Sequence, residues 1–161
     1  MSPDAVAALA VRPMREDDYA RWLPVAIASY GRDMVQNAGL DPQLAADKAD
    51  ADFARFLPNG SATEGHSFYV LEADGEQVGT LWLADRDGEL GRSLFVFEVA
   101  VGEEFRGRGY GRAAMEFAED EARRLGLEVV SLNVFGGNEV ARGLYRSLGY
   151  REDAVYMTKR L

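Results

Sequence analysis

The feature that most constrains the fold is an apolar segment followed by a glycine-rich loop, a helix and a second apolar segment. Residues 94–101 have the sequence LFVFEVAV, in which Glu98 is the single charged residue. Such a run is typical of a central strand that is covered on both faces. The periodicity predicts a helix that ends near Leu125 and a second strand at 129–134. A right-handed crossover through that helix makes the two strands parallel neighbours in one sheet.

The remaining segments predict a mixed α/β chain, and its 161 residues correspond to about one domain. Two of the predicted helices begin at residues that cap helices well, Asp41 and Asn138. The pair Asp74-Gly75 predicts a hairpin turn. The predicted elements outside the crossover are a strand at 9–14, helices at 16–31, 42–56 and 138–148, a hairpin at 67–83 and a last strand or hairpin at 150–160.

The chain contains no cysteine and a single histidine, His66. This composition excludes disulfides, thiolate nucleophiles, cysteine-based zinc sites and metal centres built from several histidines. We therefore expect no metal site. No G-x-S-x-G segment accompanies His66, and neither lysine follows a Walker glycine loop, so neither a serine hydrolase nor a P-loop ATPase is predicted.

The chain carries a net charge of -9, and the excess negative charge lies in its first half. Residues 1–90 hold 16 acidic and 7 basic side chains, whereas residues 91–161 hold 11 of each. An acidic chain repels nucleic acid, so we expect no nucleic-acid partner. The acidic half favours a cationic small molecule, unless the charge serves only solubility.

No apolar run approaches the ~20 residues that a membrane-spanning helix needs. Asp4 stands where a signal peptide carries Lys or Arg. We therefore expect a cytoplasmic protein without a membrane partner.

The glycine-rich loop at 106–112 has the composition of an anion-binding site. Alternate glycines let successive backbone N–H groups turn toward one point, and the start of the following helix adds partial positive charge. Arg106, Arg108 and Arg112 supply three cations with no acid among them. A pyrophosphate fits this arrangement. A glycine-rich turn with solvated arginines is the simpler alternative.

Two kinds of cofactor could use such a loop. The residues Gly109-x-Gly111-x-x-Ala114 match the dinucleotide fingerprint formally, and Glu128 lies near the position of its acidic ribose ligand. In that fold, however, the first glycine follows the strand directly. Here a five-residue arm, 102–106, intervenes, and only 50 residues follow Gly111. This position argues against a nicotinamide or flavin cofactor.

Two motifs resemble the GNAT superfamily of acetyl-CoA-dependent N-acetyltransferases. The segment Arg106-Gly-Arg-Gly-Tyr-Gly111 fits that family's pyrophosphate-binding pattern, Gln/Arg-x-x-Gly-x-Gly/Ala, at every fixed position. Residues 138–150 are similar to its signature N-x-x-A-x-x-L-Y-x-x-x-G-[FY]. The resemblance covers Leu94 to Tyr150, whereas residues 1–60 share only the order of elements.

The resemblance implies a single N-acetyltransferase domain over residues 1–161. The expected fold class is α/β, with a central mixed sheet that is mostly antiparallel and is flanked by helices. Two parallel strands of this sheet would splay apart and form the cofactor cleft.

The resemblance also implies acetyl-CoA as the acyl donor. Backbone groups at the end of the first parallel strand would pair with the pantetheine amides as a further strand does. The loop would hold the pyrophosphate, and Asn138, otherwise a helix cap, would contact the cofactor through its amide. The expected cofactor-binding residues are Val99, Ala100, Val101, Arg106, Gly107, Arg108, Gly109, Tyr110, Gly111, Arg112, Asn138 and Tyr145.

Two side chains are candidates for proton transfer. The resemblance implies that the Tyr145 phenol hydrogen-bonds the sulfur and protonates the departing thiolate, and packing in the core is its alternative role. A simple alkylamine with a pKa of ~10.4 is protonated at pH 7, so a base or a water chain must remove its proton. Glu98 is the best candidate, because its apolar strand would raise the carboxyl pKa. A salt-bridged strand residue is the alternative role for Glu98.

These features predict transfer of an acetyl group from acetyl-CoA to a primary amine of a small molecule or peptide, by direct attack in a ternary complex. The absence of cysteine fits a direct mechanism, because the usual covalent acyl carrier is missing. A noncatalytic acyl-CoA sensor or interaction module is the alternative. Residues 16–66 show acidity, Trp22, Tyr30 and aliphatic side chains, which do not identify the acceptor. The resemblance also allows a homodimer, although no interface is evident.

Overall fold

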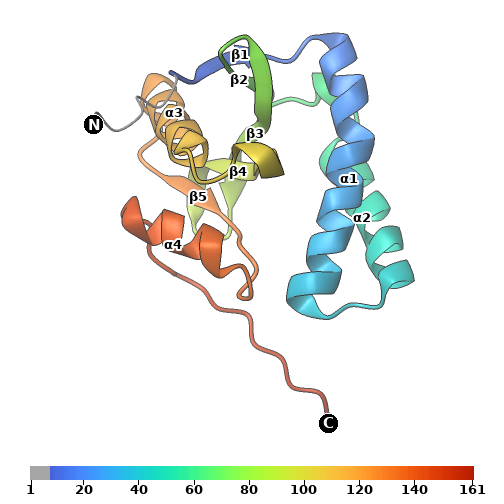
Figure 1. Ribbon diagram of the computed structural model, residues 1–161. Helices are drawn as coiled ribbons and strands as arrows, with labels where there is room; N and C mark the ends of the chain where they lie inside the picture. The colour runs from blue at the N-terminus through green and yellow to red at the C-terminus, as the bar shows by residue number, and fades with distance from the viewer. Residues whose placement is uncertain (1–7) are drawn as a thin grey trace.

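The computed structural model describes residues 8–161 and contains one five-stranded sheet with helices on both faces (Figure 1). Two short 3₁₀ turns, Gly60–Ala62 and Glu103–Phe105, complete the regular structure. The elements are β1 (Ala10–Pro13), α1 (Glu16–Ala38), α2 (Pro42–Phe56), β2 (His66–Ala73), β3 (Glu76–Gly88), β4 (Gly91–Val101), α3 (Tyr110–Arg124), β5 (Val130–Leu132) and α4 (Glu139–Ser147).

The strands lie in the order β1-β2-β3-β4-β5. All neighbours are antiparallel except β4 and β5, which are parallel with Leu94 opposite Val130 and Val96 opposite Leu132. The mixed, mostly antiparallel sheet and its crossover through α3 are therefore confirmed. Helices α1 and α2 cover one face of the sheet, and α3 and α4 lie at the other (Figure 1).

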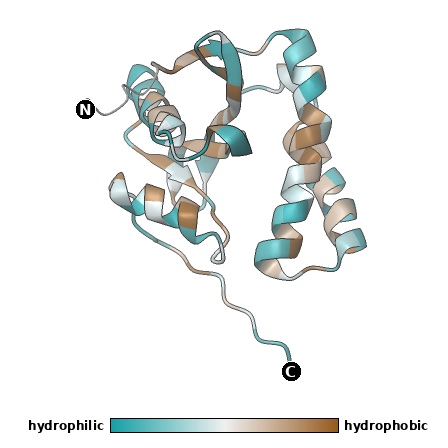
Figure 2. Cartoon of the chain, in the orientation of Figure 1, coloured by the Kyte–Doolittle hydropathy of each residue, from teal (hydrophilic) through white to brown (hydrophobic). Residues whose placement is uncertain are grey.

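The two faces of the sheet are packed with different kinds of side chain. On the α3 side the core is mainly aliphatic, and Leu71, Leu81 and Met115 are completely buried. On the α1 side the core is aromatic, with the rings of Trp22 and Trp82 in edge contact at 5.5 Å. Figure 2 shows a hydrophobic band in the middle of α1, the helix that supplies part of this aromatic core.

A β-bulge in β4 decides which face Glu98 occupies. Trp82 pairs with Glu98 and Leu83 pairs with Val96, which leaves Phe97 without a partner on β3. Phe97 stacks on Trp82, and Glu98 contacts α1, so two consecutive side chains face the same side of the sheet. Strict alternation would have directed Glu98 into the aliphatic core, and the bulge avoids this burial of a charge.

The predicted end of the first helix at Gly31 is wrong. Helix α1 continues for two further turns to Ala38 and ends at Gly39, whose φ of 66° is the left-handed conformation of a helix C-cap. Gly31 is instead buried against α2. A Cβ at this position would lie 3.7 Å from the Ala45 carbonyl oxygen and 3.8 Å from the Ala49 Cβ, so the small residue permits close helix packing.

Three predicted strand boundaries also differ from the structure. The polar segment expected as a turn at 85–91 extends the hairpin instead, because Asp85 on β3 accepts two hydrogen bonds from Arg92 on β4. Strand β5 is shorter than predicted, and its pairing stops at Leu132. The last strand expected at 150–160 is absent, since residues 151–161 form no regular structure.

Across residues 8–161, no helix is both long and apolar enough to span a membrane.

Candidate functional site

The loop before α3 presents a run of free backbone N–H groups. Gly107 and Gly109 have φ values of 75° and 86°, which only glycine adopts without strain. The first hydrogen bond of the helix joins the Ala113 N–H to the Gly109 carbonyl. Within residues 8–161, none of the six amides of residues 107–112 donates to another group of the chain. Six adjacent unsatisfied donors at a helix start are a strong anion-binding arrangement.

The three arginines of this loop add positive charge and form no ion pair within the described chain, although the charge of Asp33 acts on Arg106. Arg106 donates to the Val101 carbonyl at 3.2 Å and Arg108 to the Glu104 carbonyl at 3.0 Å. Arg112 donates to the Ser147 hydroxyl at 2.7 Å. No Asp or Glu of the described chain lies within 4.0 Å of any of these three guanidinium groups. The loop therefore fits a pyrophosphate in both geometry and charge.

The two motifs noted in the sequence meet in space. Besides the Arg112–Ser147 bond, a Cβ on Gly111 would lie 3.4 Å from the Leu144 side chain, so the start of α3 packs closely on α4. Tyr110, at the start of α3, is buried in the aliphatic core. Tyr110 was predicted to bind the cofactor, and only its backbone N–H faces the loop.

Strand β4 has an unpaired edge beyond its bulge. The parallel pairing with β5 ends at Val96, yet β4 continues to Val101. The Gly102 N–H donates to β3, and the Ala100 carbonyl oxygen points at Gly79 of β3. Since successive residues face opposite edges of a strand, the backbone groups of Val99 and Val101 face the open edge. Ala100, also expected to bind the cofactor, has its carbonyl directed at β3 instead.

The Glu98 carboxylate lies on the α1 side of the sheet, where two donors hold it. Its Oε1 accepts hydrogen bonds from the Trp22 indole at 2.9 Å and from the Thr80 hydroxyl at 2.8 Å. Burial raises the pKa of Glu98, the two hydrogen bonds oppose that rise, and the nearby charge of Asp33 adds to it. No cation pairs with Glu98 among the described residues, which disfavours its alternative role as a salt-bridged strand residue.

Tyr145 and Asn138 lie on α4 as the sequence indicates. Asn138 caps the helix, because its Oδ1 accepts the Ala141 N–H at 3.2 Å. The Tyr145 ring packs against the aliphatic core and meets Tyr150 edge-on at 6.0 Å. Burial raises the pKa of its hydroxyl, which makes no hydrogen bond within the described part of the chain. A core tyrosine normally has a partnered hydroxyl, so this free group is available to a ligand.

The site contains three further residues that sequence reasoning did not single out. Trp22 was expected only as an apolar helix position, and Thr80 only as a strand residue, yet both orient Glu98. Asp33 follows Trp22 by three helical turns on the same face of α1, and burial raises the pKa of its carboxyl. No local signal reveals these contacts, because each depends on the packing of α1 on the sheet.

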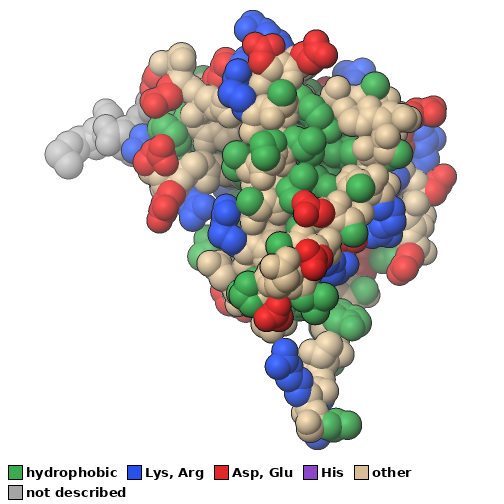
Figure 3. All heavy atoms as spheres, turned by 90° about the vertical axis from the view of Figure 1, so that its right-hand side faces the viewer, with side chains coloured by type: hydrophobic (Ala, Val, Ile, Leu, Met, Phe, Trp, Pro, Cys, Tyr) green, Lys and Arg blue, Asp and Glu red, His purple; other side chains and the backbone are tan. Residues whose placement is uncertain are grey.

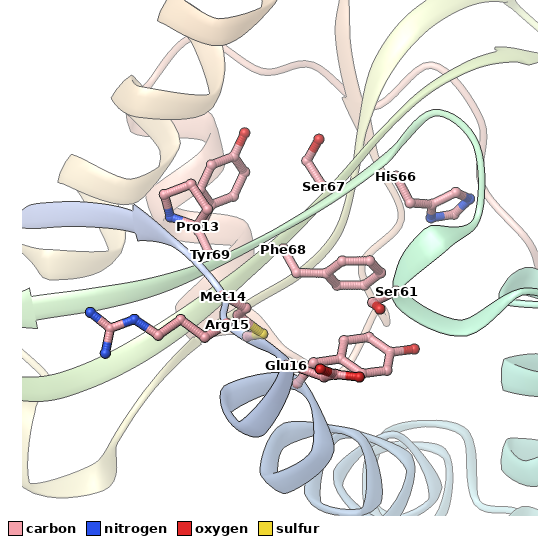
Figure 4. A pocket seen from close by; sticks show the side chains of 10 residues that line it. Pro13, Met14, Arg15, Glu16, Ser61, His66, Ser67, Phe68 and Tyr69 are labelled. Atoms are coloured by element: carbon pink, nitrogen blue, oxygen red, sulfur yellow. The ribbon is translucent and has the colours of Figure 1, made fainter.

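Two cavities of the molecule lie elsewhere. One of about 450 Å³ opens between the start of α1 and strand β2 (Figure 4). Figure 4 shows the Phe68 ring and His66 on one side of β2, with Ser67 and Tyr69 on another. A second cavity of about 500 Å³ borders β5. None of the predicted site residues lines either cavity.

A mixed sheet whose parallel strands separate beside a cationic, amide-lined loop defines an acyltransferase-like α/β protein. The model of the acetyltransferase (GNAT) family matches residues 33–150, which is more than half of the chain. The chain therefore belongs to the GNAT acetyltransferase family, and the resemblance that the two motifs carried is confirmed.

Individual relatives agree with this assignment. The chain is 27% identical over 155 residues to the uncharacterized N-acetyltransferase YdgE of Bacillus subtilis, covering 96% of this chain and 99% of that one. It is 28% identical to the acetyltransferase YycN of Bacillus subtilis, whose crystal structure matches with a TM-score of 0.88 over 96% of this chain and 99% of that chain. A predicted acetyltransferase from Clostridium acetobutylicum, crystallised with acetyl-CoA, shares the fold at 16% identity and a TM-score of 0.65, covering 95% and 96% of the two chains.

Proposed function

We propose that this chain transfers an acetyl group from acetyl-CoA to a primary amine by direct attack in a ternary complex. The observation that carries the proposal is the run of six free amides at 107–112, beside three unpaired arginines and the open edge of β4. These groups match the two recognition elements of coenzyme A, which are a diphosphate and an amide-bearing arm.

The residues would divide the work of holding the donor. The backbone amides of 107–112 and the side chains of Arg106, Arg108 and Arg112 would bind the phosphates. The backbone groups of Val99 and Val101 would pair with the amides of the pantetheine arm, as an added strand pairs with a sheet edge. Bound in this way, acetyl-CoA supplies the activated thioester.

Glu98 is proposed to accept the proton of the acceptor amine, directly or through a water. Its raised pKa brings the carboxylate closer to the basicity that this step needs, while Trp22 and Thr80 occupy one carboxylate oxygen and leave Oε2 free. Tyr145 is proposed to give its hydroxyl proton to the departing thiolate. The hydroxyl has no competing partner in the described chain, so no internal hydrogen bond must break first.

The acceptor is proposed to be a cationic amine. The charge of Asp33 on α1 raises the pKa of Glu98 on β4, while burial raises the pKa of Asp33 and the charges of Arg32 and Arg106 oppose that rise. An ammonium group beside Glu98 would offset the charge of Asp33. The acidic first half of the chain would also attract such a molecule from solution.

Calorimetric titration with acetyl-CoA tests the anion site through a matched pair of glycines. Gly107 and Gly126 flank α3 at φ values of 75° and 72°, and neither has a neighbour that would touch a Cβ within 4 Å. An alanine in this conformation costs about 1–2 kcal/mol, and the free loop can relieve this strain by leaving the binding conformation, so Gly107→Ala should weaken acetyl-CoA binding by up to roughly 5- to 30-fold. Gly126→Ala carries the same strain and should leave the affinity unchanged. Equal affinities for both variants would argue against the loop as the binding site.

Release of free thiol from acetyl-CoA across a panel of mono- and polyamines tests catalysis itself. Acceptor-dependent thiol release is expected. Binding of acetyl-CoA without thiol release under any condition would favour the noncatalytic sensor instead.

A further inference from the structure

Arg86, near the end of β3, carries a charge that the described chain leaves unpaired. Its Nε is buried and has no hydrogen-bond partner in residues 8–161. No Asp or Glu of this part of the chain forms an ion pair with it. Burial lowers the pKa of the guanidinium, because a charge that is partly removed from water is costly. An unpaired cation in such a position indicates that a ligand supplies the missing partner.

Two phenylalanine rings hold the guanidinium in place. Its Cζ lies 3.6 Å from the centroid of the Phe95 ring and 5.0 Å from that of the Phe97 ring. Phe97 stacks in turn on Trp82 at 4.2 Å. A ring face attracts a cation without supplying an oxygen acceptor, so the guanidinium is positioned while its N–H groups stay available. This arrangement suits an anion with two oxygen atoms in one plane, which is a carboxylate.

His66 adds a neutral N–H donor beside this group. Its Nδ1 accepts a hydrogen bond from the Trp82 indole at 2.9 Å, so the proton of the neutral ring is on Nε2. Burial and the charge of Arg86 lower the pKa of His66, which therefore stays uncharged near neutral pH. The centroids of the His66 and Phe97 rings are 5.4 Å apart. Arg86 and His66 thus offer N–H donors to the same anion.

This group lies on the same side of the sheet as Glu98. Trp82 is opposite Glu98, and Arg86 follows Trp82 by four positions on β3, which corresponds to about 13 Å along the strand. Phe97 precedes Glu98 in the chain and also contacts the Arg86 guanidinium, so its half-buried ring connects the two charges. Helices α1 and α2 cover this side of the sheet, and Figure 3 shows hydrophobic side chains gathered in the middle of the face that they form. A molecule that lies over Phe97 can reach Glu98 with one end and Arg86 with the other.

We propose that the acceptor carries a carboxylate as well as its amine, and that Arg86 binds the carboxylate while Glu98 receives the amine. Three extended residues span at most about 11 Å, and the two side chains cover the rest of the separation, so a short peptide has a suitable length. The ammonium group of such an acceptor remains the cation that Glu98 attracts. This inference rests on the proposed acetyl transfer and adds a second group that the acceptor must carry.

Thiol release with two matched acceptors tests the inference. Triglycine and triglycinamide differ only in the carboxylate, so the ratio of their kcat/KM values measures its recognition. In the wild type this ratio should favour triglycine by roughly 10-fold, as expected for a hydrogen bond between charged groups. Arg86→Met keeps an unbranched side chain over Phe95 and removes the charge, so the preference should disappear. An unchanged ratio in Arg86→Met, or no preference for triglycine in the wild type, would overturn the proposal.

Two further variants separate recognition from folding, since a ratio measured on one protein does not depend on how much of it is folded. Arg86→Lys keeps a point charge and should retain part of the preference. The matched control is Arg92→Met in the same hairpin, where the arginine already donates to Asp85 at 2.8 Å. This control should keep the wild-type ratio. A loss of preference in Arg92→Met equal to that in Arg86→Met would assign the effect to the net charge of the hairpin and refute binding at Arg86.

Glycine and glycinamide test the geometry, because they are too short to reach both Glu98 and Arg86. The ratio of their kcat/KM values should be the same in the wild type and in Arg86→Met. A change as large as that for the triglycine pair would indicate an effect of charge at a distance, and direct contact with Arg86 would then be wrong.

Calorimetry separates this inference from the proposed activity. Triglycine should bind the protein saturated with coenzyme A more tightly than triglycinamide does, and Arg86→Met should remove the difference. This result without thiol release would refute the acetyl transfer and retain the carboxylate site. Thiol release without any binding that depends on the carboxylate would refute the carboxylate site and retain the acetyl transfer.

Discussion

The substitution Thr80→Val tests how the protein sets the basicity of Glu98. Valine keeps the shape and the strand preference of threonine and removes only the hydroxyl, which donates to Glu98 Oε1 at 2.8 Å. Trp22 continues to donate to the same oxygen at 2.9 Å, so the carboxylate is not left without a partner. The variant therefore isolates one hydrogen bond to a charged group.

The size of the effect follows from that bond. A hydrogen bond to a charged group is worth about 1.5–3 kcal/mol, and one pKa unit corresponds to about 1.4 kcal/mol. The Thr80 bond stabilises the ionised form, so its loss should raise the pKa of Glu98 by about 1 to 2 units above its already raised value. A base must be deprotonated to act, and the acidic limb of the rate profile should move to higher pH by the same amount.

The assay is the pH dependence of kcat/KM for the acceptor amine, followed by thiol release. The acceptor titrates identically with both proteins, so a difference between the two profiles belongs to the enzyme. Glu98→Gln should keep only the acidic limb that the acceptor's own titration sets, and adding Thr80→Val to it should then change nothing. Superimposable profiles for wild type and Thr80→Val, or a shift by Thr80→Val that persists in the Glu98→Gln background, would refute the assignment of Glu98 as the base.

Three further substitutions test separate parts of the structure. Tyr145→Phe should keep the calorimetric affinity for acetyl-CoA and lower kcat by one to a few decades, as expected for a lost general acid, whereas an unchanged kcat would remove Tyr145 from the mechanism. The guanidinium of Arg12 lowers the pKa of Asp18 to about 2, so Asp18 stabilises the fold above its ordinary pKa of 3.8 and this contribution is lost as the pH falls through about 2. In urea titrations, Asp18→Asn should destabilise the protein at pH 6 and match the wild type near pH 2, and a pH-independent difference would contradict this account. Gly31→Ala should raise the free energy of unfolding by up to about 1 kcal/mol, because the new Cβ makes ordinary contacts at 3.7 and 3.8 Å in a helix interior, while Gly31→Leu should be destabilising.

The sequence predicts the elements whose signals are local. The caps at Asp41 and Asn138 lie where expected, and the turn at Asp74-Gly75 closes the expected hairpin with φ values of 52° and 77°. The glycine-rich loop is similarly readable, since its glycines precede α3 as expected and leave the amides of 107–112 free within the described chain. Gly31 shows the limit of such local reasoning. A glycine that ends a helix and one that lets a second helix approach look the same until the packing of α1 on α2 is known.

Residues 150–160 show a second limit. They have the composition of a strand, and that prediction is wrong because these residues pair with no neighbouring strand in the described structure. Composition therefore indicates that a segment can pair, and the fold decides whether it does.

The two halves of the proposed site meet at the bulge in β4. Parallel pairing with β5 ends at Val96, and the next residue, Phe97, is the bulge. After this point the outer edge of β4 is free for a ligand, and the side-chain alternation is shifted so that Glu98 faces α1 instead of the aliphatic core. A regular strand would have directed this acid into the aliphatic core. The bulge therefore explains why the most apolar strand of the chain tolerates a charged residue, Glu98, which lies beside the open edge.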